Sequence, residues 1–207
     1  MIPKNIYILH NKLKVADNIS KKWNELHPEF DIKHYNSENV DLFFMNVPDI
    51  YRNIYLKIQD DALKADFLRF AVLNEKGGFV IDSNLEPLYN INMFPVDKNL
   101  ILAKTMEENE NNTYCNKFLA CIPHHHVIER LCKTFVNHYT DGCYFISHYW
   151  KASNLMDLLL ECENDKDVTF LKQQCAYFFY DACFTYKKKR IINDKTPYFS
   201  DSVKFND

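Results

Sequence analysis

Charged residues with the spacing needed for chemistry lie on either side of a glycine pair. Asp66 and Arg69 are three positions apart in a stretch with a helical pattern, so both side chains share one helix face. Gly77 and Gly78 end that stretch, and an apolar run then leads to Asp82. A helix, a glycine pair, a strand and a carboxylate in this order can build a site for a metal ion and a diphosphate.

The acidic end of this run predicts a metal site. If the strand continues beyond Asp82, then Asn84 and Glu86 share its face, because side chains alternate along a strand. Such oxygen ligands suit Mg²⁺ or Mn²⁺, and such an ion stabilises a diphosphate leaving group. The alternatives are a solvated strand end and, for Asp66 and Arg69, a surface ion pair of little energetic value.

The surrounding pattern predicts the elements that position these residues. Short apolar or alternating runs predict strands at Ile6–Leu9, Phe30–Tyr35, Phe79–Asp82, Leu100–Ala103, Phe118–Ile122 and Tyr177–Tyr180. Longer amphipathic runs predict helices at Ala16–Leu26, Ser37–Met45, Tyr51–Lys76 with a break near Asp60, His124–Tyr139 and Ser147–Glu161. Alternating strands and helices indicate an α/β fold with a largely parallel sheet flanked by helices. Ligands of such folds bind at the carboxyl ends of strands, where Asp82 is expected.

Composition excludes several classes of protein. The chain has 207 residues, which fits one domain spanning 1–207, and 47% of them are hydrophobic, which excludes disorder. Its net charge of −3 argues against a nucleic-acid partner. Seven cysteines without a CxxC pair favour free thiols in a reducing compartment. Without a signal sequence or a membrane-spanning run, we expect a soluble, cytoplasmic protein.

The stretch from residue 64 to 86 resembles the core of the DXD-type sugar transferases of glycosyltransferase family 32, a group that includes α-mannosyltransferases and capsular-polysaccharide transferases. The family pattern reads roughly A-x-x-D-x-x-R-y-x-x-L-y-x-x-G-G-x-Y-x-D-x-D. The matching positions are Asp66, Arg69, Leu73, Gly77, Gly78 and Asp82. Three further segments, Ile2–Tyr7, Trp23–Phe30 and Asn116–Ala120, resemble the family's I-P-K-x-I-H, W-x-x-x-x-P-x-[YF] and N-x-f segments. The likeness covers about residues 1–140.

This resemblance implies a single-domain enzyme of the GT-A type. It implies a nucleotide-sugar donor, most simply UDP-linked, a glycan or other hydroxyl acceptor, a divalent metal (Mn²⁺ or Mg²⁺), and hexosyl transfer with retention. Asp66 and Arg69 would hold the donor sugar, and Asp82 and Asn84 would bind the metal. The substrate-binding set is completed by Tyr7, Gly78 and Ser83. The first strand and the helix of Trp23 would frame the base, with the nucleotide sugar bound by about 1–140 and the acceptor by about 141–207.

The chain departs from the family pattern at positions that matter for this reading. The second aspartate of the motif is Asn84, which brings no charge to a metal, although Glu86 could compensate. Val80 replaces an aromatic residue, and Tyr7 replaces a histidine but could still stack on a base. Two alternatives follow: a nucleotide-sugar-binding module without turnover, and a metal-dependent nucleotidyltransferase. The second is less favoured because no basic, glycine-rich loop follows the first strand. No catalytic residue is identified from the sequence.

Overall fold

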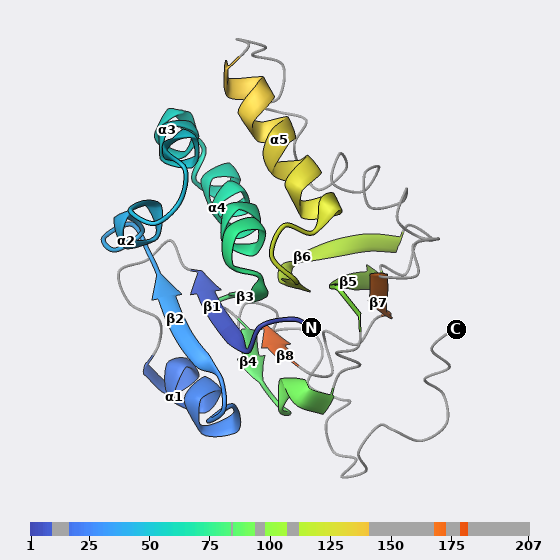
Figure 1. Cartoon of the computed structure of the whole chain (residues 1–207). Helices are drawn as coiled ribbons and strands as arrows, with labels where there is room; N and C mark the ends of the chain where they lie inside the picture. The colour runs from blue at the N-terminus through green and yellow to red at the C-terminus, as the bar shows by residue number, and fades with distance from the viewer. Residues whose placement is uncertain are drawn as a thin grey trace.

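The computed structural model describes residues 1–9, 17–83, 85–93, 98–106, 112–140, 168–172 and 179–181 (Figure 1). Its helices are α1 (Asp17–Leu26), α2 (Asp41–Phe44), α3 (Asp49–Lys57), α4 (Asp61–Lys76), α5 (His126–Thr140) and the 3₁₀ turn η1 (Ile91–Met93). Its strands are β1 (Asn5–Leu9), β2 (Asp31–Tyr35), β3 (Gly78–Asp82), β4 (Leu85–Pro87), β5 (Leu100–Met106), β6 (Asn112–Cys121), β7 (Val168–Lys172) and β8 (Phe179–Asp181).

The main sheet has six strands in the order β2-β1-β3-β6-β5-β7. The pairs β1–β2, β1–β3 and β5–β7 are parallel, whereas β6 runs antiparallel to both of its neighbours. Strand β4 pairs with β8 in a separate two-stranded sheet. The predicted α/β fold with a largely parallel sheet is therefore confirmed.

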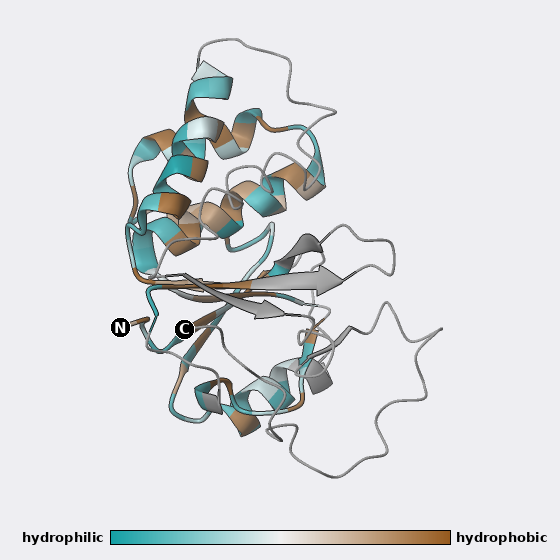
Figure 2. Ribbon diagram, turned by 90° about the vertical axis from the view of Figure 1, so that its right-hand side faces the viewer, coloured by the Kyte–Doolittle hydropathy of each residue, from teal (hydrophilic) through white to brown (hydrophobic). Residues whose placement is uncertain are grey.

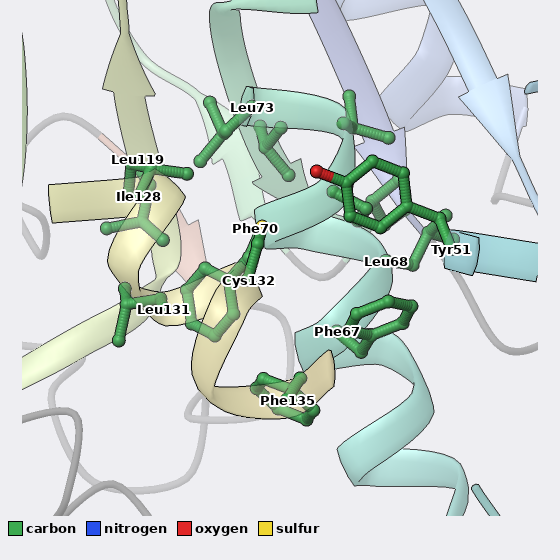
Figure 3. Close-up of a cluster of buried hydrophobic side chains, with 14 of the residues drawn as sticks. Tyr51, Phe67, Leu68, Phe70, Leu73, Leu119, Ile128, Leu131, Cys132 and Phe135 are labelled. Carbon is green, nitrogen blue, oxygen red and sulfur yellow. The ribbon is translucent and has the colours of Figure 1, made fainter. Parts of the chain in front are cut away.

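Helices cover both faces of the sheet, which Figure 2 shows edge-on. Alternation along β1 divides the core into two clusters: Tyr7 and Leu9 face α2 to α5, whereas Ile6 and Ile8 face the side of α1. On the first side, α4 and α5 pack through aromatic contacts such as Phe67 with Phe135, whose ring centroids lie 5.2 Å apart (Figure 3). On the other side, Trp23 of α1 is fully buried.

The local predictions agree closely with the elements as far as the described residues reach. The long helical stretch does break near Asp60, whose side chain caps α4 by accepting a hydrogen bond of 2.9 Å from the backbone N–H of Leu63. The strand predicted at Phe118–Ile122 is the second half of the longer β6, and the one predicted at Tyr177–Tyr180 overlaps β8. The predicted helix at Ser147–Glu161 and most of the acceptor part at 141–207 lie outside the described residues.

The glycine pair between α4 and β3 has a structural explanation. Gly77 (φ 62°) and Gly78 (φ 88°) both adopt a backbone conformation that other residues rarely take. A Cβ on Gly77 would lie 2.6 Å from Pro123 Cδ, and one on Gly78 would lie 2.7 Å from the carbonyl oxygen of Asn5. The pair therefore permits a tight turn between a buried helix and a central strand.

Candidate functional site

Asp82 is the last residue of β3, at the carboxyl end of the three parallel strands. Phe79 and Ile81 of β3 belong to the core on the side of α1, whereas Val80 belongs to the core under α4. Because side chains alternate along a strand, Asp82 shares the face of Val80 and is directed toward α4. About a quarter of its side chain is exposed. The strand thus delivers one accessible carboxylate to the edge of the sheet where α/β folds bind ligands.

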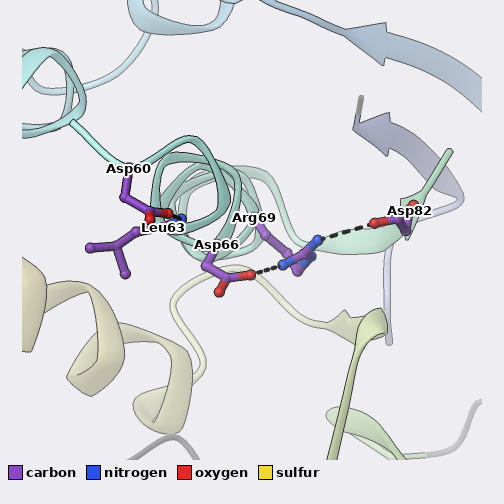
Figure 4. A network of polar contacts seen from close by, with 5 residues as sticks. All are labelled: Asp60, Leu63, Asp66, Arg69 and Asp82. Atoms are coloured by element: carbon purple, nitrogen blue, oxygen red, sulfur yellow. Dashed lines mark hydrogen bonds and ion pairs between the residues drawn. The ribbon is translucent and has the colours of Figure 1, made fainter. Parts of the chain in front are cut away.

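Arg69 of α4 lies between two carboxylates (Figure 4). Its Nη1 donates a hydrogen bond to Oδ1 of Asp66, one helical turn earlier, and its Nη2 lies 3.9 Å from Oδ2 of Asp82. Only 4% of the Arg69 side chain is exposed, against 24% for Asp66 and 25% for Asp82. The arrangement joins the predicted residues of the helix and the strand. The alternative prediction, a surface ion pair between Asp66 and Arg69, does not describe this arrangement, because the guanidinium of Arg69 is buried.

The turn after β3 is held from both sides. The backbone N–H of Ser83 donates to the carbonyl of Leu9 at the end of β1, with an N–O distance of 3.1 Å. The carbonyl of Leu85 accepts a hydrogen bond from Nε1 of the buried Trp23, at 2.9 Å. Asn84, the second predicted metal ligand, lies between these two residues and outside the described part of the chain. Its role stays a prediction.

Strand β3 ends at Asp82. A shared face of Asp82, Asn84 and Glu86 would have required the strand to continue. Ser83 lies in a turn, and Glu86 belongs to β4 in the second sheet. The carboxylate of Glu86 forms an ion pair with Lys22 of α1. The condition for one shared acidic face is therefore not met, because the chain turns out of the main sheet directly after Asp82.

The remaining predicted contacts lie in different surroundings. Gly78 is at the opposite end of β3 from Asp82, about 13 Å along the strand at about 3.3 Å per residue. Tyr7 is 3% exposed and its ring stacks on Tyr35, with centroids 5.9 Å apart. Burial raises the pKa of Tyr7 to about 12, with added contributions from Tyr35 and Asp31, so its phenol stays neutral at physiological pH. The structure thus gives both residues packing roles, and their predicted contacts with substrate stay untested.

The oxygen atoms of this site fit a divalent cation that is also bound by the phosphates of a substrate. Among the described residues, no group of three or more His, Cys, Asp or Glu side chains could hold an ion on its own. Asp82 is an exposed carboxylate, but it already faces the guanidinium of Arg69. Mg²⁺ commonly takes only one or two protein carboxylates and completes its shell with phosphate oxygens and water. Asp82 with the amide of Asn84 could serve such an ion.

Contacts made by α1 were missed at the level of sequence. The helix of Trp23 was expected only to help frame a base, and no role was predicted for His27; both side chains are buried. Both instead bond to the segment that follows β3, through Leu85 and Ile91. Their four-residue spacing, which places them on one helix face, was the available signal.

Comparison with known proteins shows what this part of the chain is similar to. Residues 14–107, a little under half of the chain, match the family described as "Glycosyltransferase sugar-binding region containing DXD motif". The matched region contains Asp66, Arg69, Asp82 and the whole of β3. The resemblance to DXD-type glycosyltransferases is thereby confirmed, whereas membership of family 32 stays a prediction. No curated protein matches the chain.

Several solved structures of glycosyltransferases resemble the chain. The PaToxG glycosyltransferase matches with a TM-score of 0.55 and 14% identity, over 77% of this chain and 69% of that one. A glycosyltransferase involved in the glycosylation of the major capsid of PBCV-1 matches at 0.44 with 8% identity, over 81% of each chain. GlyE of Streptococcus pneumoniae TIGR4 matches at 0.46 with 12% identity, over 84% of this chain and 46% of that one. The PaToxG likeness supports the GT-A type of fold, and the two lower scores carry no conclusion.

None of the helices in the described residues is long and apolar enough to cross a membrane.

Proposed function

We propose that this protein is a glycosyltransferase that moves a sugar, most simply a hexose, from a UDP-linked donor to a hydroxyl of a glycan or another acceptor. The observation that carries the proposal is the linkage of Asp66, Arg69 and Asp82 at the carboxyl edge of the sheet. This linkage lies within the region that matches a glycosyltransferase sugar-binding family.

The exposed fractions of the three side chains favour a different role for each of them. Asp66 is the accessible member on α4, and its carboxylate can accept hydrogen bonds from hydroxyls of the donor sugar. Arg69 is almost fully buried, so it acts mainly by fixing the two carboxylates in direction and spacing. A carboxylate held in this way loses little conformational freedom when the sugar binds, which favours affinity.

The diphosphate of the donor would lie beside Asp82 and Ser83. A divalent cation, Mn²⁺ or Mg²⁺, held by Asp82 and Asn84 together with the phosphates, would neutralise the charge of the departing diphosphate. Ser83 offers a hydroxyl at the turn, and its backbone is fixed by Leu9. Residues 141–207 are proposed to bind the acceptor. Retention of configuration is proposed from the family resemblance.

The test is a panel of UDP-, GDP- and ADP-sugars in a thermal-shift assay, with Mn²⁺ or with chelator, followed by turnover of the stabilising donor. UDP-sugars are expected to raise the melting temperature in the presence of Mn²⁺. Asp82→Asn should remove that shift and Asp66→Asn should reduce it, whereas Asp41→Asn, an exposed acid paired with Arg52, should keep it. If no nucleotide sugar stabilises the wild type, the proposal is rejected.

A binding module without turnover is the second candidate. It is favoured by the neutral Asn84 in the motif. Release of free UDP from a UDP-sugar separates the two functions. An enzyme releases UDP at a rate proportional to the enzyme concentration, whereas a module binds the UDP-sugar and leaves it intact.

A further inference from the structure

The last two turns of α1 and His27, the residue that follows this helix, hold the chain after β3 at several points. The ion pair of Lys22 with Glu86 is the most exposed of these contacts. Asn90 donates from its side chain to the carbonyl of Leu26. The other two contacts, made by Trp23 and His27, are buried. Together they cover the segment from Leu85 to Ile91, which follows the D-S-N turn directly.

The buried contacts are specific hydrogen bonds. Nε1 of Trp23 donates to the carbonyl of Leu85 at 2.9 Å, and the backbone N–H of Ile91 donates to Nε2 of His27 at 3.0 Å. Because Nε2 accepts, the ring proton of His27 resides on Nδ1, which lies 3.0 Å from the carbonyl of Trp23. His27 is thus a neutral histidine with both ring nitrogens satisfied. It also stacks on Trp23, with ring centroids 4.8 Å apart.

These bonds have consequences for position 84. Ser83 is tied to β1 and Leu85 is tied to α1, so both neighbours of Asn84 have fixed backbones. His27 extends the second attachment to Ile91. A binding or catalytic site must hold its groups to within about 0.5 Å of the productive geometry. The hydrogen bonds of Trp23 and His27 therefore affect how accurately the turn after β3 is positioned for a ligand.

We infer that Trp23 and His27 are positioning residues for the donor site, because their hydrogen bonds to Leu85 and Ile91 fix the backbone that follows Asp82. The inference rests on the proposed function and adds to it a pair of residues that touch no ligand. Removing either hydrogen bond leaves a buried backbone group without its partner, which favours local opening of the segment.

His27 offers a matched pair of substitutions. His27→Gln keeps a polar acceptor near the position of Nε2, whereas His27→Leu has a similar volume and no acceptor. We expect His27→Leu to accelerate amide exchange at residues 85–91 at least tenfold and to weaken UDP binding in the presence of Mn²⁺ at least tenfold. His27→Gln should recover most of both. Lys21→Ala, which removes an exposed ion pair with Glu25 on the same helix, should change neither.

The possible outcomes distinguish a failure of this inference from a failure of the proposed function. If the wild type binds no UDP, the proposed function falls and the inference falls with it. If the wild type binds UDP and His27→Leu binds it within twofold, or leaves exchange at residues 85–91 unchanged, the inference alone is overturned. Should His27→Leu fail to fold, Trp23→Phe decides by the same two measurements, because it keeps an aromatic ring in the core and removes the indole N–H together with part of the ring.

Discussion

Nη2 of Arg69 lies 3.9 Å from Oδ2 of Asp82, and the same guanidinium bonds to Asp66 on its own helix. One buried cation therefore joins the middle of α4 to the end of β3. Two ionised carboxylates against one guanidinium leave the group with one net negative charge, and both acids are partly open to solvent. The group is thus suited to accept hydroxyl donors and cations, and its integrity depends on Arg69.

Replacing Arg69 by Met should impair both stability and ligand binding. Asp66 and Asp82 would lose their shared partner, and a hydrogen bond between charged groups contributes about 1.5–3 kcal/mol. Chemical denaturation should show a loss of this size, and UDP-sugar binding should be lost. Arg52→Met is the control, since Arg52 is half exposed and its pair with Asp41 contributes little. A stable Arg69→Met protein with unchanged binding would contradict the role assigned to the linkage.

Asp66→Asn should separate binding from folding. The amide keeps the shape of the side chain, and the site is partly exposed, so the free energy of unfolding should fall by about 1 kcal/mol or less. Affinity for the sugar part of the donor should fall at least tenfold, while affinity for UDP alone should be nearly unchanged. Calorimetry with UDP and with the UDP-sugar measures the difference. Equal losses for both ligands would show that Asp66 does not contact the sugar.

Gly78→Ala tests whether the second glycine serves the fold or the substrate. The new Cβ would lie 2.7 Å from the carbonyl oxygen of Asn5, in a backbone conformation with φ 88°. Steric strain at such a position costs about 1–3 kcal/mol. We expect a lower melting temperature with unchanged UDP affinity per folded molecule. A selective loss of affinity at unchanged stability would restore the predicted role in substrate binding.

Much of this arrangement follows from local sequence rules. The apolar run of β3 predicts a buried strand that ends at Asp82, and the spacing of Asp66 and Arg69 predicts their shared helix face. Gly77 marks the end of α4 because no other residue adopts its conformation easily. These features depend on near neighbours in the chain, so a single sequence is sufficient to predict them.

The features that could not be predicted depend on long-range pairing. Nothing local shows that β6 inserts antiparallel beside β3, or that the chain leaves the main sheet after Asp82. The role of Trp23 depends on Leu85, which is 62 positions away, and that of His27 depends on Ile91. The bonds of both side chains are to backbone atoms, so the identities of Leu85 and Ile91 carry no signal of them.

His27 should make the stability of the protein sensitive to mild acid. Burial lowers its pKa from the ordinary value of 6.5, against smaller opposing effects from the carbonyl of Trp23 and the nearby Glu29. Below about pH 6.5 the unfolded chain therefore binds a proton that the folded chain does not, and stability falls as the pH falls toward the lowered pKa. Denaturation of wild type and His27→Gln at pH 7.5 and pH 5.5 isolates this contribution, because other histidines are common to both. A pH dependence identical in the two proteins would contradict the assignment.

The nature of the metal site can be tested at Asp82 and Asn84. If one carboxylate and one amide share a cation with the diphosphate, UDP should bind at least tenfold more tightly with Mn²⁺ than with chelator. Without a nucleotide, Mn²⁺ should bind weakly, because the described residues provide no three-ligand cluster.

Substitutions at the two positions should act in opposite directions. Asn84→Asp adds a charged oxygen, which hard cations prefer, so the Mn²⁺ concentration that gives half-maximal UDP binding should fall. Turnover need not rise with it, because only interactions that are stronger in the transition state increase the rate. Asp82→Asn removes the one carboxylate of the D-S-N motif, and the effect of Mn²⁺ on UDP binding should disappear. A Mn²⁺ titration of UDP binding to the wild type and both variants decides the matter. If Asn84→Asp leaves the half-maximal concentration unchanged and Asp82→Asn keeps its response to Mn²⁺, the turn after β3 does not bind the metal, and the cation must be held elsewhere.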